Sequence, residues 1–344
     1  MGPLAGLTII EMAGIGPGPF AGMMLADMGA DVVRVERPQP TAGSLATDPV
    51  LLRGRRVLRL DLKQPDAVES LLALCETADA LIEGFRPGVM ERLGLGPAQC
   101  CARNSRLVYG RMTGWGQTGP LAPRAGHDIN YIALSGALAA IGRAGDKPLP
   151  PLNLIADFGG GGMLLAFGVV CALFEARQSG RGQVVDAAMV DGSSSLMAMF
   201  HGLRAQGAHT GARGTNLLDS GAPFYETYET ADHQYMAVGA LEPAFYAELL
   251  QRLGLDPGRQ PAQYDVASWP AMKQKFTEIF RTKTRADWSE HFADSDACVT
   301  PVLSIAEAAE HPHNAQRQSF IQHAGTLQPA PAPRFSRTVP KLQR

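Results

Sequence analysis

The first third of the chain alternates apolar, β-rich runs with helical runs, and this alternation restricts the fold more than any other feature. Helical runs at 20–30 and 65–78 lie between β-rich segments at 7–13, 31–38, 57–63, 79–85 and 106–112. A strand, a helix and a second strand in succession form a βαβ unit, whose two strands are parallel. The sequence therefore predicts an α/β fold with a Rossmann-like, doubly wound and mostly parallel sheet. Such sheets bind ligands at the carboxyl ends of their strands.

The remainder of the chain predicts a second, smaller domain. A long, buried helix at 159–180, closed by Gly180, and a strand at 182–192 complete the first domain. A hairpin at 225–241 is followed by a helix at 242–255 and by two helices that contain Trp269 and Trp288. We therefore expect a large α/β domain at 1–200, a linker at 201–220 and a small α+β domain at 221–314. The Pro-rich tail, 315–344, is expected to return to the large domain.

The composition excludes several functional classes. With 31 Lys and Arg against 33 Asp and Glu, the formal charge is -2, which argues against a nucleic-acid footprint over the whole surface. The five cysteines have no zinc spacing, so we expect no metal site. The odd number of cysteines, with Cys75 and Cys171 in apolar helical runs, predicts reduced, buried thiols and a cytoplasmic location. Cys298 has two interpretations, a nucleophile and a core thiol, of which the core thiol is favoured. We expect neither a signal peptide nor an apolar stretch long enough to span a bilayer.

The turn GIGPGPFA after the first strand has two interpretations. Gly16, Gly18 and Ala21 fit the G-x-G-x-x-A dinucleotide fingerprint, with Glu36 at a suitable distance along the chain. However, a pyrophosphate cradle needs free backbone N–H groups at the helix start, and the two prolines in the turn remove two of them. A structural turn is therefore the favoured interpretation, and a nicotinamide or flavin cofactor remains an alternative.

Arginines are concentrated near the predicted strand ends. Surface charge explains any single one, but several at one sheet edge would suit a polyphosphate, because guanidinium binds phosphate through two hydrogen bonds. The candidates are Arg34, Arg37, Arg53, Arg55, Arg56, Arg59, Lys63, Arg86 and Arg92.

His127 and Asp157 each stand before an apolar helical run and are the candidate catalytic groups. Helix capping alone would explain Asp157 as an N-cap residue. The four glycines at 159–162, however, each destabilise a helix by about 1 kcal/mol relative to alanine, which indicates that something packs closely against that backbone. Exposed amides at a helix start can also bind an oxyanion. An acid, an imidazole and free amides are the groups needed to remove a proton next to a carbonyl.

Motifs from nearly the whole chain resemble the family III CoA-transferase superfamily and, within it, the α-methylacyl-CoA racemases. They include GFRPGVMERLGLGP, RMTGWGQTGP, GHDINYIALSG, PPLNLIADFGGGGM and GRGQVVDAAMVDG. The resemblance implies two chains interlocked as a homodimer, with active sites shared between the large domain of one subunit and the small domain of the other. It implies no cofactor, since acyl-CoA is the substrate. The residues it implies in CoA binding are Arg37, Leu60, Asp61, Leu62, Lys63, Gly84, Phe85, Arg86, Arg92, Gly126, Asp128, Ile129, Asn130 and Tyr131.

The residue before Asp128 separates two branches of that superfamily. In the transferases, an aspartate matching Asp157 is the nucleophile, and tyrosine typically stands where this chain has His127. The histidine favours a racemase that interconverts (R)- and (S)-2-methylacyl-CoA thioesters through an enolate, with His127 and Asp157 as the two bases. The resemblance implies that Glu242 partners the histidine, and Asn153 is expected to bond to Asp157. A CoA-transferase using Asp157 is the main alternative, and a non-catalytic CoA-binding protein is another.

Overall fold

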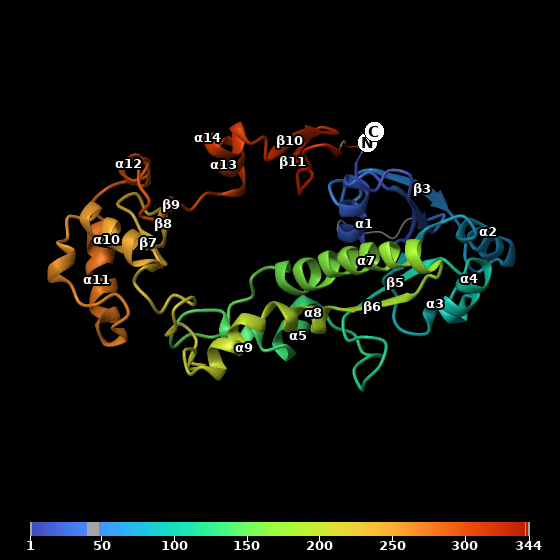
Figure 1. Ribbon diagram of the computed structural model, residues 1–344, viewed down its shortest axis with the longest axis horizontal. Coiled ribbons are helices and arrows are strands. Elements are labelled where there is room, and N and C mark those ends of the chain that lie inside the picture. Colours follow the sequence, from blue (N-terminus) through green and yellow to red (C-terminus); the bar gives the residue numbers. More distant parts are fainter. Residues whose placement is uncertain (1, 40–47, 341, 343–344) are drawn as a thin grey trace. The chain divides into compact units, whose positions relative to one another are not determined.

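The computed structural model describes residues 2–39, 48–340 and 342. The described chain divides into two compact units (Figure 1). Unit 1 comprises Met1–Ala137, Pro150–Ala198 and Phe320–Arg344, and unit 2 comprises Leu138–Leu149 and Met199–Ser319. These units assign 138–149 to the second body, unlike the boundaries expected from the sequence, which stay a prediction.

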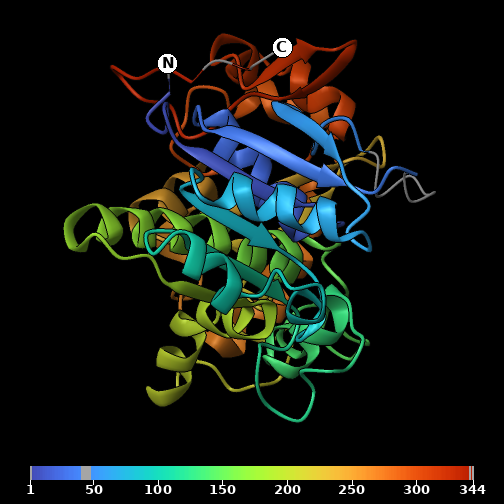
Figure 2. The same ribbon diagram turned by 90° about the vertical axis from the view of Figure 1, so that its right-hand side faces the viewer.

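A parallel sheet is the centre of unit 1. In the described residues it has six strands in the order β3-β2-β1-β4-β5-β6, all paired in parallel. Figure 2 draws the blue and teal arrows of this sheet side by side. The order is that of a doubly wound Rossmann sheet, so the predicted fold class is confirmed at the level of a parallel α/β sheet. The strands are β1 (Thr8–Met12), β2 (Asp31–Glu36), β3 (Arg55–Arg59), β4 (Ala80–Glu83), β5 (Val108–Thr113) and β6 (Val184–Ala188).

Burial explains why the central strands are apolar runs. Every residue of β4 and β5 is buried, whereas the edge strands β3 and β6 are partly exposed. Central parallel strands are covered on both faces, so both sets of side chains need to be apolar or paired. The predicted strand at 57–63 begins earlier, at Arg55, because the edge position tolerates its charged side chains.

Three of the four helices that follow the first strands of the sheet begin with proline. They are α1 (Pro17–Asp27), α2 (Pro65–Cys75), α3 (Val89–Arg92) and α4 (Pro97–Arg103). The prediction that the first helix starts at residue 20 is therefore wrong by three residues. Proline fits the first helical turn, where its missing N–H needs no partner. The prolines that argued against a phosphate cradle are thus part of α1 itself.

The region after the sheet's fifth strand contains α5 (Asp128–Leu134), α6 (Ala137–Ala140), the π-helix η2 (Leu154–Met163), α7 (Leu164–Ser179), α8 (Met189–Leu196) and α9 (Ala198–Ala205). The predicted helix at 159–180 thus begins earlier, as a π-helix, and ends as predicted at Gly180, whose φ is +75°. Figure 1 draws α7 along β5 and β6, with which it packs.

The continuous helix Leu154–Ser179 corrects two predictions. It is 26 residues long and contains an 18-residue stretch with a mean hydropathy of 1.8, so by length and composition alone it could cross a membrane, contrary to the expectation. A core helix of a globular protein can have the same length and composition, and this helix packs on the sheet. It is also not wholly buried: Phe167 and Phe174 are 67% and 66% exposed, and Cys171 is exposed.

Unit 2 has an antiparallel sheet of β7 (Tyr225–Glu229), β8 (Tyr235–Gly239) and β9 (Val299–Pro301), which confirms the predicted hairpin. Its aromatic core includes Phe224, Phe276, Phe280 and Trp288. The helices are α10 (Pro243–Arg252), α11 (Trp269–Phe280), α12 (Arg285–His291), α13 (Ile305–Glu310) and α14 (Pro312–Gln316), with 3₁₀ turns η3 (Pro257–Arg259) and η4 (Val266–Ser268). The expectation of a core position for Cys298 is wrong, since this thiol is exposed.

The C-terminal segment of unit 1 begins with a short hairpin of β10 (Phe320–His323) and β11 (Thr326–Pro329). Arg53 joins it to the rest of the unit: its Nη1 donates to Gln328 Oε1 at 2.8 Å and to the carbonyl of Pro329 at 2.7 Å. The same guanidinium bonds to Asp27 through Nε at 3.0 Å. A buried charge with this many partners fixes the hairpin's position on unit 1.

Candidate active site

His127 precedes the first turn of α5 and is exposed. Its own backbone N–H donates to Asn130 Oδ1 at 3.0 Å, which closes the start of the helix. The buried Tyr131 supports this loop from beneath, because its hydroxyl donates to the carbonyl of Gly126 and its ring stands edge-on to Trp115, with centroids 4.7 Å apart. A Cβ on Gly126 would lie 2.7 Å from the tyrosine ring, so only glycine allows the imidazole to be presented in this way.

Asp157 lies in the first turn of the π-helix and is half-buried. The prediction that it is the N-cap residue is wrong, since Asn153 occupies that position. Asn153 bonds to it as expected: its Nδ2 donates to Asp157 Oδ2 at 3.0 Å. π-Helical turns are rare and occur frequently at functional sites, because they displace one residue from the regular helical stripe.

The four glycines after Asp157 allow two helices to approach the π-helix backbone. A Cβ on Gly160 would lie 2.6 Å from the backbone nitrogen of Ser193 in α8. One on Gly162 would lie 2.8 Å from the carbonyl oxygen of Pro17 in α1. The predicted close packing against this backbone is confirmed. The glycines stand in the body of the π-helix, where N–H groups bond back along the helix, so the amides at its start belong to earlier residues.

One buried carboxylate joins the starts of the two candidate helices. Asp128, which follows His127, is 5% exposed. Its Oδ2 accepts the backbone N–H groups of Ala156 at 2.7 Å and of Asp157 at 2.8 Å. His127 is the covalent neighbour of Asp128, and the backbone of Asp157 is hydrogen-bonded to the Asp128 side chain. Both candidate bases are therefore linked to the same residue. The side chain of Asp128 is thereby turned inward, away from solvent.

A turn that the sequence marked only as structural also reaches Asp157. Gly16 has φ +65°, and a Cβ there would lie 3.2 Å from Asp157 Oδ2. The segment GIGPGP contains no pattern that predicts contact with Asp157. It indicates only that a glycine can adopt a positive φ in this turn. Glu36, the supposed ribose ligand of a dinucleotide site, instead accepts a hydrogen bond from Arg34 Nε at 2.9 Å. The turn therefore borders the candidate site.

Burial governs the electrostatics of the site. Burial raises the pKa of the Asp157 carboxyl; the hydrogen bond from Asn153 lowers it, the charge of Asp128 raises it and that of His127 lowers it, with a net rise. Burial, with the nearby Asp157 charge, raises the pKa of Tyr131 to about 12, while Arg86 opposes the rise. Tyr131 bonds to the residue before His127, and the Asp157 backbone bonds to the residue after it, so these three side chains belong to one site. A carboxyl of raised pKa beside an imidazole can exchange protons with a bound molecule.

The residues expected to bind CoA follow β2, β3 and β4. Arg37, Lys63, Arg86 and Arg92 are exposed, and Ile129 and Asn130 are exposed on α5. Leu60, Leu62 and Phe85 pack partly on the sheet's core, and Asp61 accepts the N–H of Lys63 at 3.2 Å. Parallel strands end at one edge of the sheet, so these segments gather at the carboxyl edge. Glu242 is the N-cap residue of α10 in unit 2.

Three of the arginines considered for phosphate binding are buried and paired with carboxylates. Arg34 and Arg55 both bond to Glu11, with Arg55 Nε at 2.9 Å from Glu11 Oε2, and Arg53 bonds to Asp27. All these side chains are nearly inaccessible. Buried charges need such partners because desolvation is costly. The polyphosphate interpretation is therefore wrong for these three. Arg56 and Arg59 pair with Asp31 and Glu36 at the surface. The exposed candidates that remain are Arg37, Lys63, Arg86 and Arg92.

The whole chain has the sequence pattern of one known family. Residues 4–344 match the family model described as CoA-transferase family III. The chain belongs to CoA-transferase family III. It is 51% identical to the alpha-methylacyl-CoA racemase of Mus musculus and 48% identical to that of Homo sapiens, each over 344 residues, 99% of this chain and 89% of the relative. The crystal structure of a CAIB/BAIF family protein from Brucella suis has a TM-score of 0.84 at 26% identity, covering 99% and 94% of the chains.

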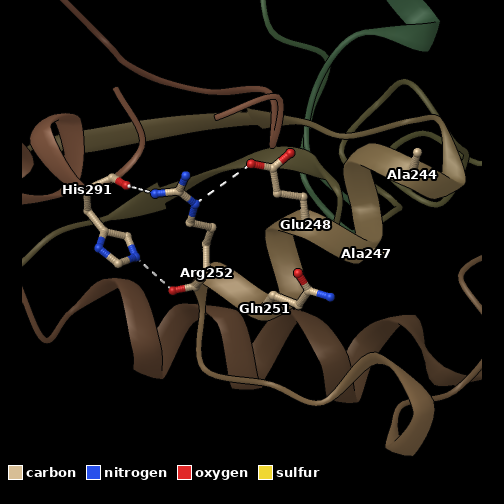
Figure 3. Close-up of a pocket in the computed structure, with 6 residues that line it drawn as sticks. All are labelled: Ala244, Ala247, Glu248, Gln251, Arg252 and His291. Atoms are coloured by element: carbon tan, nitrogen blue, oxygen red, sulfur yellow. Dashed lines mark hydrogen bonds and ion pairs between the residues drawn. The ribbon is translucent and has the colours of Figure 1, made fainter. Parts of the chain in front are cut away.

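A hollow of about 560 Å³ in unit 2 of this CoA-transferase family III member is lined by Ala244, Ala247, Glu248, Gln251, Arg252 and His291 (Figure 3). None of them was expected in the site. Arg252 Nη1 donates to the His291 carbonyl at 2.9 Å, and His291 Nε2 lies 2.8 Å from the Arg252 carbonyl oxygen. Arg252 and His291 thus already bond to each other and connect α10 to α12.

Proposed function

We propose that this protein is an α-methylacyl-CoA racemase that interconverts (R)- and (S)-2-methylacyl-CoA thioesters by 1,1-proton transfer at C2. The observation that carries the proposal is the pairing of His127 with Asp157 through Asp128. A nucleophilic aspartate would need no histidine as its neighbour, whereas a proton transfer between two faces of one carbon needs two groups. The racemases of mouse and human, 51% and 48% identical, support the same reaction.

The two bases have complementary roles in this mechanism. The α-proton of a thioester is weakly acidic, so one base removes it while the site stabilises the enolate oxygen. The other base returns a proton to the opposite face, so it starts protonated when its mate starts deprotonated. By the resemblance, His127 acts on the S-epimer and Asp157 on the R-epimer. The raised pKa of Asp157 supports its role as a proton donor. Glu242 of the partner subunit is proposed to orient the imidazole.

Replacing Asn153 with alanine should change the pH dependence of the reaction. The hydrogen bond from Asn153 lowers the pKa of Asp157, so its loss should raise that pKa further. A carboxylate base works only when deprotonated, so the acidic limb of kcat/KM for the R-epimer should move to higher pH. The limb is measured from α-proton exchange rates against pH; an unmoved or lowered limb would contradict the assigned contact.

The exposed arginines near the carboxyl edge are proposed to hold the CoA phosphates. Arg92 ends the short helix α3 and is exposed, so its guanidinium is accessible to a ligand. Replacing Arg92 with alanine should raise KM about tenfold with a smaller change in kcat, because a remote phosphate contact stabilises substrate and transition state alike. Steady-state kinetics with one acyl-CoA measures both values, and a loss confined to kcat would rule out this role.

A homodimer is proposed to cover the apolar side of α7. Leu164, Phe167, Val170 and Phe174 are exposed at helical spacing, which makes one stripe. Contiguous exposed apolar surface marks an interaction site, and a second copy of the chain would bury it without a membrane. Sedimentation equilibrium should give twice the mass of the chain, and Phe174→Glu should shift the population toward monomer. A monomeric wild-type protein would overturn both the dimer and the shared active sites. We also propose a cytoplasmic location for this dimer.

The decisive experiment is proton NMR of one epimer of a 2-methylacyl-CoA incubated with the protein in D₂O. Exchange of the proton at C2 for deuterium collapses the α-methyl doublet to a singlet, and the opposite epimer should accumulate. A doublet that persists over several chain lengths would overturn the racemase. In that case a free acid is added as acceptor, and a new acyl-CoA would indicate a CoA-transferase with Asp157 as the nucleophile.

A further inference from the structure

The carboxylate of Asp128 is built into the backbone beneath both bases. It is 5% exposed, and a single oxygen, Oδ2, accepts the N–H groups of Ala156 and Asp157 at 2.7 and 2.8 Å. Early amides of a helix have no partner in the helix itself, so an acceptor from elsewhere in the chain satisfies them. The acceptor here comes from the residue that follows His127.

The second oxygen of the same side chain has no such explanation. Asp128 Oδ1 is buried and has no hydrogen-bond partner among residues 2–39, 48–340 and 342. A buried carboxylate oxygen without a donor is costly, and an amide or hydroxyl could accept the two N–H groups without bringing a charge. Helix capping therefore explains the two hydrogen bonds to Oδ2, but it does not explain why the capping side chain is a carboxylate and not an amide or a hydroxyl.

We propose that Asp128 is a positioning residue for proton transfer, which holds the Asp157 backbone at a fixed place relative to His127 and sets the charge state of Asp157 by its own negative charge. This inference rests on the proposed racemase function and adds to it a residue that acts through the base. It also gives Asp128 a role different from contact with CoA, for which its inward carboxylate is unsuited.

Few other charges face the base. At the start of α5, the charges of His127 and Asp128 act on Asp157, and the charge of Asp157 acts on Tyr131. Asn153, at the N-cap of the π-helix, donates a hydrogen bond to Asp157. Arg86, after β4, acts on Tyr131. The positions at which α1 and α8 approach the π-helix, Gly16 and Gly192–Ser193, carry no ionisable side chain. Removal of the Asp128 charge should therefore lower the pKa of Asp157, the opposite direction to Asn153→Ala.

Two substitutions of Asp128 separate its hydrogen bonds to the Asp157 backbone from the effect of its negative charge. Asp128→Asn keeps a side-chain oxygen that can accept both N–H groups and removes the charge. It should keep kcat within about tenfold, and the acidic limb of kcat/KM for the R-epimer should move to lower pH. Asp128→Ala leaves both amides without an acceptor, so the base is displaced; kcat should fall about 100-fold with KM little changed.

Asp79 provides the matched control. Its carboxylate accepts the N–H of Thr8 at 2.8 Å, at the amino edge of the sheet, opposite the proposed site. Asp79→Ala should lower the melting temperature and leave kcat and the pH profile unchanged. If Asp128→Ala does not fold, as judged by circular dichroism, the Asn variant still decides.

The outcomes distinguish the inference from the function on which it rests. A shifted limb in Asp128→Asn supports the positioning and charge role, since a merely structural residue would not move it. Wild-type exchange together with an unmoved limb in the Asn variant would overturn the inference alone. A wild-type protein that exchanges no α-proton would overturn the proposed function, and the inference with it.

Discussion

His127→Ala is expected to slow exchange of the α-proton from the S-epimer by about 10²–10⁴-fold, the usual contribution of a general base. The exchange of the R-epimer should persist, because Asp157 still removes that proton. Inversion should be lost from both epimers, since the R-epimer loses its proton donor and the S-epimer loses its base. The imidazole is exposed and its loop is held by the Gly126 backbone and Tyr131, so truncation should leave the fold intact.

The measurement is deuterium incorporation from each pure epimer, with binding followed separately through KM. Asp157→Asn is the reciprocal variant: it should slow exchange of the R-epimer and spare the S-epimer. If His127→Ala exchanges both epimers at near wild-type rates, the two-base mechanism is wrong. If both variants lose both epimers equally, the two residues act as one unit and not as separate bases.

Gly192→Ala is expected to destabilise the protein by about 1–3 kcal/mol or more, although alanine is the better helix former. Gly192 lies in α8, and its Cβ would overlap the carbonyl of Gly160 in the π-helix, where backbone and not a flexible side chain would have to move. The displaced π-helix carries Asp157, so kcat should fall as well. Urea unfolding with steady-state kinetics measures both effects.

Gly202→Ala is the matched control for this substitution. Gly202 also lies within a short helix, α9, but nothing is within 4 Å of its added Cβ. The same chemical change should therefore stabilise the protein, by about 0.5–1 kcal/mol. Equal effects at the two positions would show that helix propensity, and not contact between α8 and the π-helix, decides the outcome.

Local patterns predicted the elements better than their boundaries. The β-rich run LTIIEMA becomes β1 at Thr8–Met12, because its apolar side chains need burial on both faces of the sheet. The helix α1 starts three residues before the predicted position, because Pro17 and Pro19 belong to its first turn, which proline suits as well as it suits a loop. The sequence did not predict the exposed apolar stripe on α7, because a helix that is apolar on all sides gives no indication of which side is covered.

Local patterns also identified which residue types to examine, but not their partners. Arg34 and Arg53 looked like surface phosphate ligands, whereas Glu11 and Asp27 neutralise them inside unit 1. The capping expected of Asp157 is performed by Asp128, whose Oδ2 accepts the N–H groups of Ala156 and Asp157. In each case the partner is one that a chain pattern leaves open, because hydrogen bonds between distant segments have no periodicity.

The sequence by itself determined the parallel α/β architecture, the closely packed glycines after Asp157 and the candidate status of His127 and Asp157. These follow from periodicity, backbone freedom and chemical type, which are properties of short segments. Only the tertiary structure decided that Gly16 borders Asp157 and that the Asp128 carboxylate holds the start of its helix. Those contacts depend on how α1, α5 and the π-helix pack at one edge of the sheet, and packing is a property of the whole folded unit.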